Sequence, residues 1–161
     1  MNTISKKWLN EFTGFCWGEA YIGVTRYFRR KKWGENYWLF RGQIKISLRS
    51  DDLLLLEDFQ SKLGGHIYKT RKRFVYNIAN KEKSYLQKPG YGWIVTNHEE
   101  LRKIVKILSR SLLSAKKRES LEVMKKFLKL VHKTGKKYTK VEWEEMEQLR
   151  QESINATKFN E

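Results

Sequence analysis

The spacing of apolar residues changes from that of a helix to that of a strand near residue 20, and this change constrains the fold more than any other feature. Apolar side chains recur at helical intervals from Trp8 to Cys16, which predicts an amphipathic helix over roughly residues 6–18. Apolar and polar residues then alternate over residues 21–30, which predicts a strand. Glu19, an isolated carboxylate, lies where the two patterns meet.

The rest of the chain repeats this order of helix and strand. Alternation predicts further strands over residues 37–48, 66–79 and 91–96, with a polar, turn-rich stretch between the last two. Helical spacing and capping residues predict further helices over residues 51–63, 99–109, 114–132 and 141–153. The sequence therefore predicts one α+β domain over residues 1–161, in the order αββαββα with further helices at the end.

Five residues are expected to mark helix ends. Ser50 can cap the second helix, and the glycine pair at 64 and 65 should end it. Asn97 and Thr139 each precede a glutamate by three residues, which is the spacing of a capping box. These signals place the predicted helix boundaries independently of the apolar spacing.

The charge of the chain indicates a polyanionic partner. Thirty-four Lys and Arg residues stand against 18 Asp and Glu, a formal net charge of +16, and an aromatic content of 14% indicates a folded core. Nucleic acid is the first expectation, since no apolar run approaches the roughly 20 residues that span a bilayer and no signal-peptide pattern opens the chain. We expect a protein of the cell interior, in the cytoplasm or an organelle with access to DNA. The lone Cys16 excludes an intrachain disulfide and is expected to fill space.

Residues 12–20, FTGFCWGEA, resemble the nonapeptide that names the LAGLIDADG homing endonucleases, with a glycine third, a small residue seventh and an acid eighth. Trp17 stands where that family usually has an aspartate, and Ala20 where it has a final glycine. The similarity covers nearly the whole chain, because it extends to residues 44–68, 91–101, 112–130 and 137–155. The resemblance implies an antiparallel, saddle-shaped sheet with helices on one face.

The resemblance also implies an active site. Glu19 matches the metal-binding carboxylate, and the carbonyl of Gly18 would add a ligand to Mg²⁺. Lys116 or Lys117 matches the active-site lysine, with Lys116 as the first choice. These residues would serve metal-dependent cutting of both strands of a long pseudo-palindromic DNA site, with 3′ overhangs.

The family often has a glutamine at the end of the second strand. Leu48 occupies that place here, so Arg49 or Gln43 would have to cover its role.

The first predicted helix carries a feature that fits a homodimer. Gly14 and Gly18 are one turn apart on the same helix face and would let a second helix approach closely. Single-motif members of the family resemble half of the two-motif enzymes, which implies a twofold axis between two such helices, with an interface formed by Glu11, Gly14, Phe15 and Gly18. The alternative is that the glycines only relieve crowding in a monomer and that Glu19 is a solvated helix-end charge.

The predicted strands supply candidate DNA contacts, because every second side chain of a strand faces the same way. The candidates for base contact are Thr25, Tyr27, Arg29, Arg41, Gln43, Lys45, Lys69, Arg71, Arg73 and Asn77. The candidates for phosphate contact are Lys31, Lys32, Lys72, Lys81 and Lys136. Two other functions stay open: a binding-only relative such as an intron maturase or regulator, and a ribosomal or RNA-packaging protein suggested by charge alone.

Overall fold

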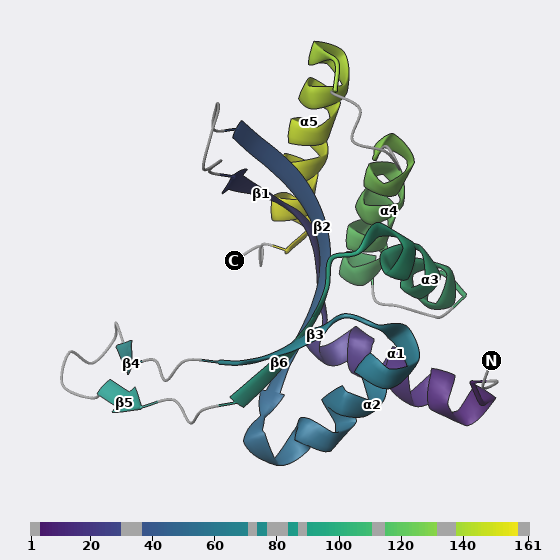
Figure 1. The fold of residues 1–161 in the computed structure, drawn as a ribbon, viewed down its shortest axis with the longest axis vertical. Coiled ribbons are helices and arrows are strands. Elements are labelled where there is room, and N and C mark those ends of the chain that lie inside the picture. The colour runs from purple at the N-terminus through teal and green to yellow at the C-terminus, as the bar shows by residue number, and fades with distance from the viewer. Residues whose placement is uncertain are drawn as a thin grey trace.

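The computed structural model describes residues 4–29, 37–70, 74–76, 84–86, 90–110, 115–131 and 138–157 (Figure 1). The helices are α1 (Lys6–Glu19), α2 (Leu53–Leu63), α3 (His98–Leu108), α4 (Ala115–Leu130) and α5 (Lys140–Thr157). The strands are β1 (Tyr21–Arg29), β2 (Tyr37–Arg49), β3 (His66–Lys69), β4 (Phe74–Tyr76), β5 (Ser84–Leu86) and β6 (Gly90–Val95). The predicted α+β order of helix, two strands, helix, strands and final helices is confirmed.

The main sheet has four antiparallel strands in the order β1-β2-β6-β3. Figure 1 shows the helices gathered on one side of this sheet, while its other side is open and curved. We call these the helix face and the open face. The predicted saddle with helices on one face is therefore confirmed.

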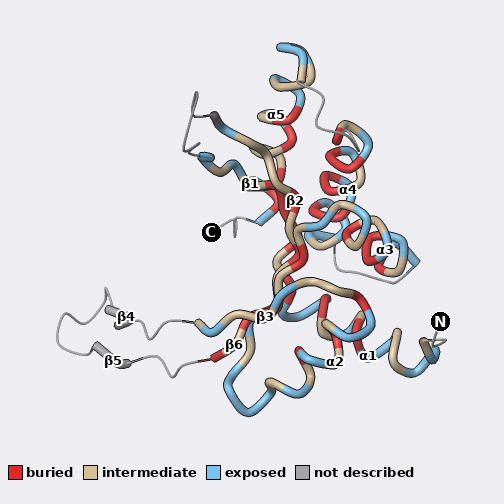
Figure 2. Tube along the Cα trace, viewed as in Figure 1, coloured by how far each residue is buried: buried red, intermediate tan, exposed pale blue. Residues whose placement is uncertain are grey.

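The core fills the space between the helix face and the helices, as the buried segments in Figure 2 show. Cross-strand pairing sets Ile22 of β1 opposite Ile44 of β2, and Ile46 of β2 opposite Trp93 of β6. All four of these side chains are at most 1% exposed. Because residues that pair across antiparallel strands share a face, this register fixes the helix face and, by alternation, the open face.

Capping confirms two predicted helix starts and corrects a third. Asn97 Oδ1 accepts from the backbone N–H groups of Glu99 and Glu100, and Thr139 forms a reciprocal capping box with Glu142. Ser50 does not cap α2, because residues 50–52 form a 3₁₀ turn and the α-helix begins only at Leu53. The Ser50 hydroxyl instead donates to the neighbouring Asp51 carboxylate.

The predicted glycine stop after α2 is confirmed. Gly64 and Gly65 have φ angles of 82° and 85°, which only glycine adopts readily. This turn is held to the following elements, since the Gly65 N–H donates to Glu100 at 3.1 Å and the Trp93 indole N–H donates to the Gly64 carbonyl at 2.8 Å. The turn therefore fixes the position of α2 against β6.

The prediction of one third strand over residues 66–79 is wrong. The pairing of β3 with β6 ends at Gly90, the first residue of β6. There the N–H and the hydroxyl of Thr70 both donate to the Gly90 carbonyl. Beyond this point β4 leaves the main sheet and pairs with β5, which lies in the stretch predicted as turn. The third strand is therefore β3, and β4 belongs to a separate two-stranded sheet.

Helix α5 closes the β1 edge of the main sheet. The Val24 N–H donates to the hydroxyl of Ser153 at 3.0 Å, and both residues are buried. Nearer the start of α5, the Trp143 ring packs on Phe40 of β2, with ring centroids 4.6 Å apart. The last helix thus positions the strand that follows Glu19.

Candidate functional site

The open face brings together the candidate DNA contacts of β1 and β2. Cα pairing sets Thr25 opposite Arg41, Gly23 opposite Gln43 and Tyr21 opposite Lys45. Alternation from these pairs puts all six predicted residues of the two strands on the open face, namely Thr25, Tyr27, Arg29, Arg41, Gln43 and Lys45. The sequence predicted which residues lie on the open face, because the apolar isoleucines of the same strands indicate the helix face.

The prediction that Lys69 lies on the open face is wrong. Lys69 pairs with Tyr91, two residues from the pair Ile67 and Trp93, and so belongs to the helix-face set. Tyr68 pairs with Gly92 and takes the open face instead. The remaining candidates, Arg71, Arg73, Asn77, Lys31, Lys32, Lys72, Lys81 and Lys136, lie outside the described residues.

Two cations of the open face rest against tyrosine rings. The Arg41 guanidinium carbon lies 4.0 Å from the centroid of the Tyr27 ring, and the Lys45 Nζ lies 5.4 Å from that of Tyr68. Both distances are within the range of a cation–π contact. The sequence analysis missed Tyr68, and the available signal was Gly92 on the next predicted strand, β6.

Glu19 is the last residue of α1 and is exposed. The helix ends cleanly there, since the N–H of the buried Ala20 donates back to the Cys16 carbonyl at 3.4 Å. On the described part of the chain there is no group of three or more His, Cys, Asp or Glu side chains that could hold a metal. Within the described residues Glu19 thus belongs to no such cluster, and a hard cation held by it would keep water and take further oxygen ligands from a substrate.

The glycines before Glu19 face open space. A Cβ atom added at Gly14 or Gly18 would meet nothing within 4 Å, so neither glycine is required by packing within this chain. Glu11 is exposed as well, and Trp17, which the sequence analysis did not assign to this surface, is 53% exposed. We call Glu11, Gly14, Trp17 and Gly18 the outer face of α1.

Phe15 does not belong to this outer face, so its assignment to the predicted interface is corrected. The Phe15 side chain is half-buried and lies edge-on to Phe59 of α2, with ring centroids 5.8 Å apart. It packs within its own chain because α2 covers that side of the helix.

The structure brings Lys117 to the end of α1. Its Nζ donates to the carbonyl of Ala20, the residue after Glu19. Burial lowers the pKa of Lys117, while Cys16 and the Glu19 carboxylate act in the opposite direction. Lys116 is exposed. Because consecutive residues of a helix are rotated by about 100°, it lies on a different side of α4 from Lys117. The geometry therefore favours Lys117 over Lys116, the first choice from sequence.

Cys16 carries no chemistry in this arrangement. It is fully buried, and burial raises its pKa to about 12, with nearby Lys117 acting the other way. The thiol is therefore neutral and fills space, as predicted.

The end of β2 places Leu48 and its two alternatives on different faces of the sheet. Leu48 pairs with Tyr91 on the helix face and packs against the core. Arg49 is exposed and pairs with Gly90 on the open face, and Gln43 lies on the same face nearer the middle of the strand. Both alternatives to Leu48 thus lie on the correct side of the sheet.

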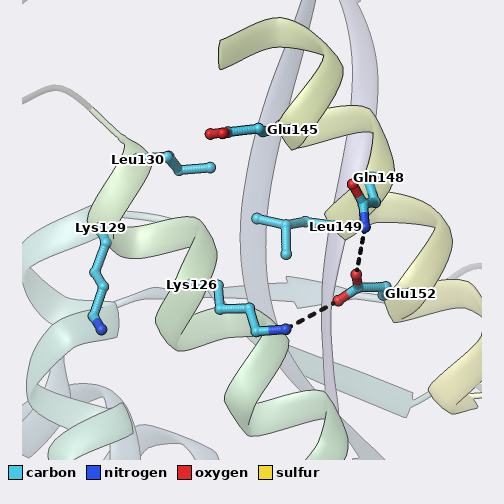
Figure 3. A pocket seen from close by; sticks show the side chains of 7 residues that line it. All are labelled: Lys126, Lys129, Leu130, Glu145, Gln148, Leu149 and Glu152. Carbon is cyan, nitrogen blue, oxygen red and sulfur yellow. Dashed lines mark hydrogen bonds and ion pairs between the residues drawn. The ribbon is translucent and has the colours of Figure 1, made fainter. Parts of the chain in front are cut away.

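A shallow groove runs between α4 and α5, on the helix side of the molecule (Figure 3). Three of its polar side chains pair with one another, since Glu152 pairs with Lys126 at 3.5 Å and accepts from Gln148 at 3.2 Å. Lys129 and Glu145 line the same groove, so it carries charges of both signs.

The sequence matches the family model of the LAGLIDADG endonucleases over residues 12–128. The chain therefore belongs to the LAGLIDADG endonuclease family. The match includes β1, β2, the second half of α1 and nearly all of α4, so it spans the segments that carry Glu19, the open face and Lys117. No curated protein sequence matches the chain.

Solved structures of homing endonucleases share the fold. The homing endonuclease I-CvuI, in complex with the I-CreI target in the presence of Mg, aligns with a TM-score of 0.67 and 17% identity over 95% of this chain and 83% of its own. The archaeal intron-encoded homing endonuclease I-Vdi141I, complexed with DNA, aligns with a TM-score of 0.60 and 18% identity. The alignment covers 95% of this chain and 86% of the I-Vdi141I chain. The meganuclease I-SmaMI, bound to DNA, aligns with a TM-score of 0.64 and 21% identity over 92% of this chain but 44% of its own.

Among the helices that the structure describes, none is long and apolar enough to cross a membrane.

Proposed function

We propose that this chain is a site-specific DNA endonuclease that acts as a homodimer, with Glu19 of each copy in a Mg²⁺-dependent site. It cuts both strands of a long pseudo-palindromic target and leaves 3′ overhangs. The observation that carries the proposal is the position of Glu19, at the end of an outer helix face lined by Gly14 and Gly18 and next to a basic open sheet.

Two observations support the homodimer. Among the described residues Glu19 belongs to no metal-holding group of acids, whereas cutting two strands needs an acid near each of two phosphates. This chain also aligns with 44% of the I-SmaMI chain, so one copy corresponds in extent to about half of that enzyme. Two copies related by a twofold axis along α1 would bring two Glu19 carboxylates together.

The open face is suited to the major groove of DNA. A two-stranded ribbon fits that groove, and β1 and β2 pair over their whole common length with the candidate contacts on one side. Arg41 can donate two hydrogen bonds to guanine, and Gln43 can pair with adenine in the same way. The formal charge of +16 supplies attraction to phosphate that carries no sequence information.

The chain's own residues would serve phosphodiester hydrolysis in distinct ways. Mg²⁺, when bound, supplies an activated water and stabilises charge on the phosphate and the leaving oxygen. The Glu19 carboxylate and the Gly18 carbonyl would hold the ion, and phosphate oxygens and water would complete its shell. Lys117 would place a positive charge next to Glu19, where the negative charge of the phosphate grows during the reaction.

A binding-only relative is the second candidate function, because the open face alone would suffice for it. Such a protein would not need an exposed carboxylate at the end of α1. The presence of Glu19 there favours the nuclease.

Incubation with a randomised DNA library and Mg²⁺ tests the proposal. One cut sequence with 3′ overhangs should be enriched, and Glu19→Gln should remove cutting of that sequence while retaining its binding, since the substitution keeps the shape and removes the charge. Glu57→Gln, an equally exposed helix residue of α2, is the matched control and should cut as the wild type does. Tight binding without cutting in any divalent metal would favour the binding-only function.

A further inference from the structure

We infer that Tyr27 and Tyr68 are positioning residues that hold Arg41 and Lys45 in place on the open face, so that each cation meets a defined base pair. The inference rests on the proposed function, because it concerns how the same face recognises DNA. It assigns a role to Tyr68, which lies on the open face through the register of β3. It also changes Tyr27 from a direct contact into a support for its neighbour.

The first pair joins β1 and β2. Tyr27 pairs with Leu39 and Arg41 pairs with Thr25, so Tyr27 and Arg41 are diagonal neighbours on the open face. The guanidinium carbon stacks 4.0 Å from the Tyr27 centroid, and both side chains are half-buried. The Thr25 hydroxyl donates to the Arg41 carbonyl at 3.3 Å and anchors the same residue through its backbone. Arg41 is therefore restrained at both its backbone and its side chain before any ligand binds.

The second pair crosses a whole strand. Tyr68 of β3 and Lys45 of β2 are separated by β6, where the residue opposite Tyr68 is Gly92. A Cβ atom at Gly92 would lie 2.3 Å from Cζ of Tyr68, so the ring occupies the space that any other side chain would fill. The ring lies across the glycine and extends toward Lys45, whose Nζ is 5.4 Å from its centroid. The missing side chain at Gly92 makes this contact possible.

The Tyr68 ring, rather than its hydroxyl, makes the contact. The hydroxyl oxygen is buried and has no hydrogen-bond partner among the described residues. A buried hydroxyl without a partner is unfavourable, so the hydroxyl does not explain the placement of the ring. Phenylalanine at position 68 should therefore keep the positioning role, which provides a rescue variant.

The two restrained cations would contact different base pairs. Arg41 and Lys45 are four residues apart on β2, about 13 Å along a strand, which equals the rise of roughly four base pairs. Arginine held in a fixed plane can meet two acceptors of one guanine, whereas lysine offers a point charge. A side chain already restrained in the free protein loses less rotamer freedom on binding. Loss of either tyrosine should therefore weaken base preference at one position of each half-site.

A binding selection tests this without cleavage. Wild type and variants are incubated with DNA randomised across the target in EDTA, and the bound DNA is sequenced. Arg41→Ala and Lys45→Ala first identify the base positions that depend on each cation. Tyr27→Leu should then lower the preference at the Arg41-dependent position by on the order of three- to tenfold, and Tyr27→Phe should restore it.

Gly92→Ala gives an independent test of the second pair. It leaves Tyr68 in the chain but displaces its ring, and so should lower the preference at the Lys45-dependent position as Tyr68→Leu does, while Tyr68→Phe keeps it. Tyr91→Leu is the matched control, because Tyr91 is a half-buried tyrosine of β6 on the helix face, on the opposite side of the sheet from Arg41 and Lys45, and it should leave both preferences unchanged.

Two outcomes would overturn the inference. One is a wild type that binds without base preference. The other is an equal loss of preference at all positions in Tyr27→Leu and Tyr68→Leu, with no rescue by phenylalanine, which would show that the rings only support the fold. Failure to cut in Mg²⁺ with these selective effects intact would contradict the nuclease and leave the positioning role supported.

Discussion

The two sides of α1 differ in how much of their surroundings a single chain supplies. On the inner side Phe12 is fully buried, stacked on Trp8 with centroids 5.3 Å apart and edge-on to Phe59 at 5.1 Å. On the outer side, a Cβ atom at Gly14 or Gly18 would meet nothing within 4 Å. The inner side is packed within the chain, whereas the outer side is exposed and is the proposed site of dimer contact. Stability and assembly can therefore be altered separately on one helix.

Loss of the inner aromatic packing should have the largest effect on stability. Phe12→Ala removes a ring that contacts Trp8, Phe59 and Trp93, and should lower the free energy of unfolding by about 3–5 kcal/mol. Chemical denaturation measures this. Leu54→Ala is the control, because Leu54 is 78% exposed and its truncation should change stability little. An equal effect of the two substitutions would show that the inner side of α1 is not part of the core.

Lys117 lies where the two sides of α1 meet, between buried Cys16 and exposed Glu19. Lys117→Met should slow cleavage by about 10²–10³-fold, because it removes the charge next to Glu19, while Lys116→Met should have a small effect. Single-turnover cleavage of the selected target measures both. Equal losses for the two variants would mean that neither lysine has a special role.

The pH dependence of Lys117 has a definite sign. Burial lowers its pKa below the ordinary value of 10.5, so the folded protein loses this proton at a lower pH than the unfolded chain does. Cleavage that needs the protonated amine should therefore decline as the pH rises, and the decline should begin at a pH lower than 10.5. The cost of burying the charge is present at neutral pH and is relieved as the pH rises through the lowered pKa.

Substitution on the outer side should affect assembly instead of stability. Gly18→Leu would overpack a helix–helix contact at a cost of about 1–3 kcal/mol, which corresponds to a loss of dimer affinity on the order of ten- to hundredfold. Sedimentation of the protein, free and on its DNA target, measures this, and double-strand cutting should decline with it. A wild type that stays monomeric in both conditions would contradict the shared active site.

A second glycine provides the control for that experiment. A Cβ atom at Gly42 of β2 would lie 2.8 Å from the Met124 sulfur and 2.9 Å from the Phe127 ring, so Gly42→Ala should destabilise the monomer. Gly18→Leu should not, because the space at Gly18 is open and leucine favours a helix. The contrast separates a glycine required by packing from one that faces outward.

The smallest effect is expected at the surface link between α1 and α2. The Asp58 carboxylate accepts hydrogen bonds from Lys62 and from the Trp8 indole, and these lower its pKa below the ordinary value of 3.8. Asp58→Asn should lower the melting temperature at pH 7 by on the order of 1–4 °C. The difference should disappear as the pH falls through the lowered pKa, because the wild-type carboxylate is then protonated as well. A difference that persists at low pH would assign the effect to packing instead of charge.

Sequence patterns predicted those parts of the fold in which one face is clearly apolar. In β1 and β2 the buried Ile22, Ile44 and Ile46 alternate with polar residues, so the open-face set followed directly. In β3 the alternation is shorter and both faces carry amphipathic side chains, so Tyr68 and Lys69 could not be assigned from the strand alone. The pairing of β3 with β6 puts Tyr68 on the open face and Lys69 on the helix face, and the space above Gly92 holds the Tyr68 ring.

The candidate site shows the same limit. The resemblance placed Glu19 at a helix end, and the structure agrees, because Ala20 is buried and stops the helix there. It could not separate Lys116 from Lys117, because both are adjacent lysines in a basic segment. Only the approach of α4 to the end of α1 distinguishes the residue whose Nζ reaches the Ala20 carbonyl.

The contact between Ser153 and Val24 has a consequence for self-association. β1 is an edge strand, and an edge strand presents backbone N–H and C=O groups on which another strand can pair and aggregation can begin. Here the hydroxyl of a buried serine accepts one of these N–H groups, and α5 lies along the same edge. Intermolecular strand pairing is thereby obstructed at the edge nearest Glu19. This edge of the sheet is therefore a poor starting point for aggregation by strand addition.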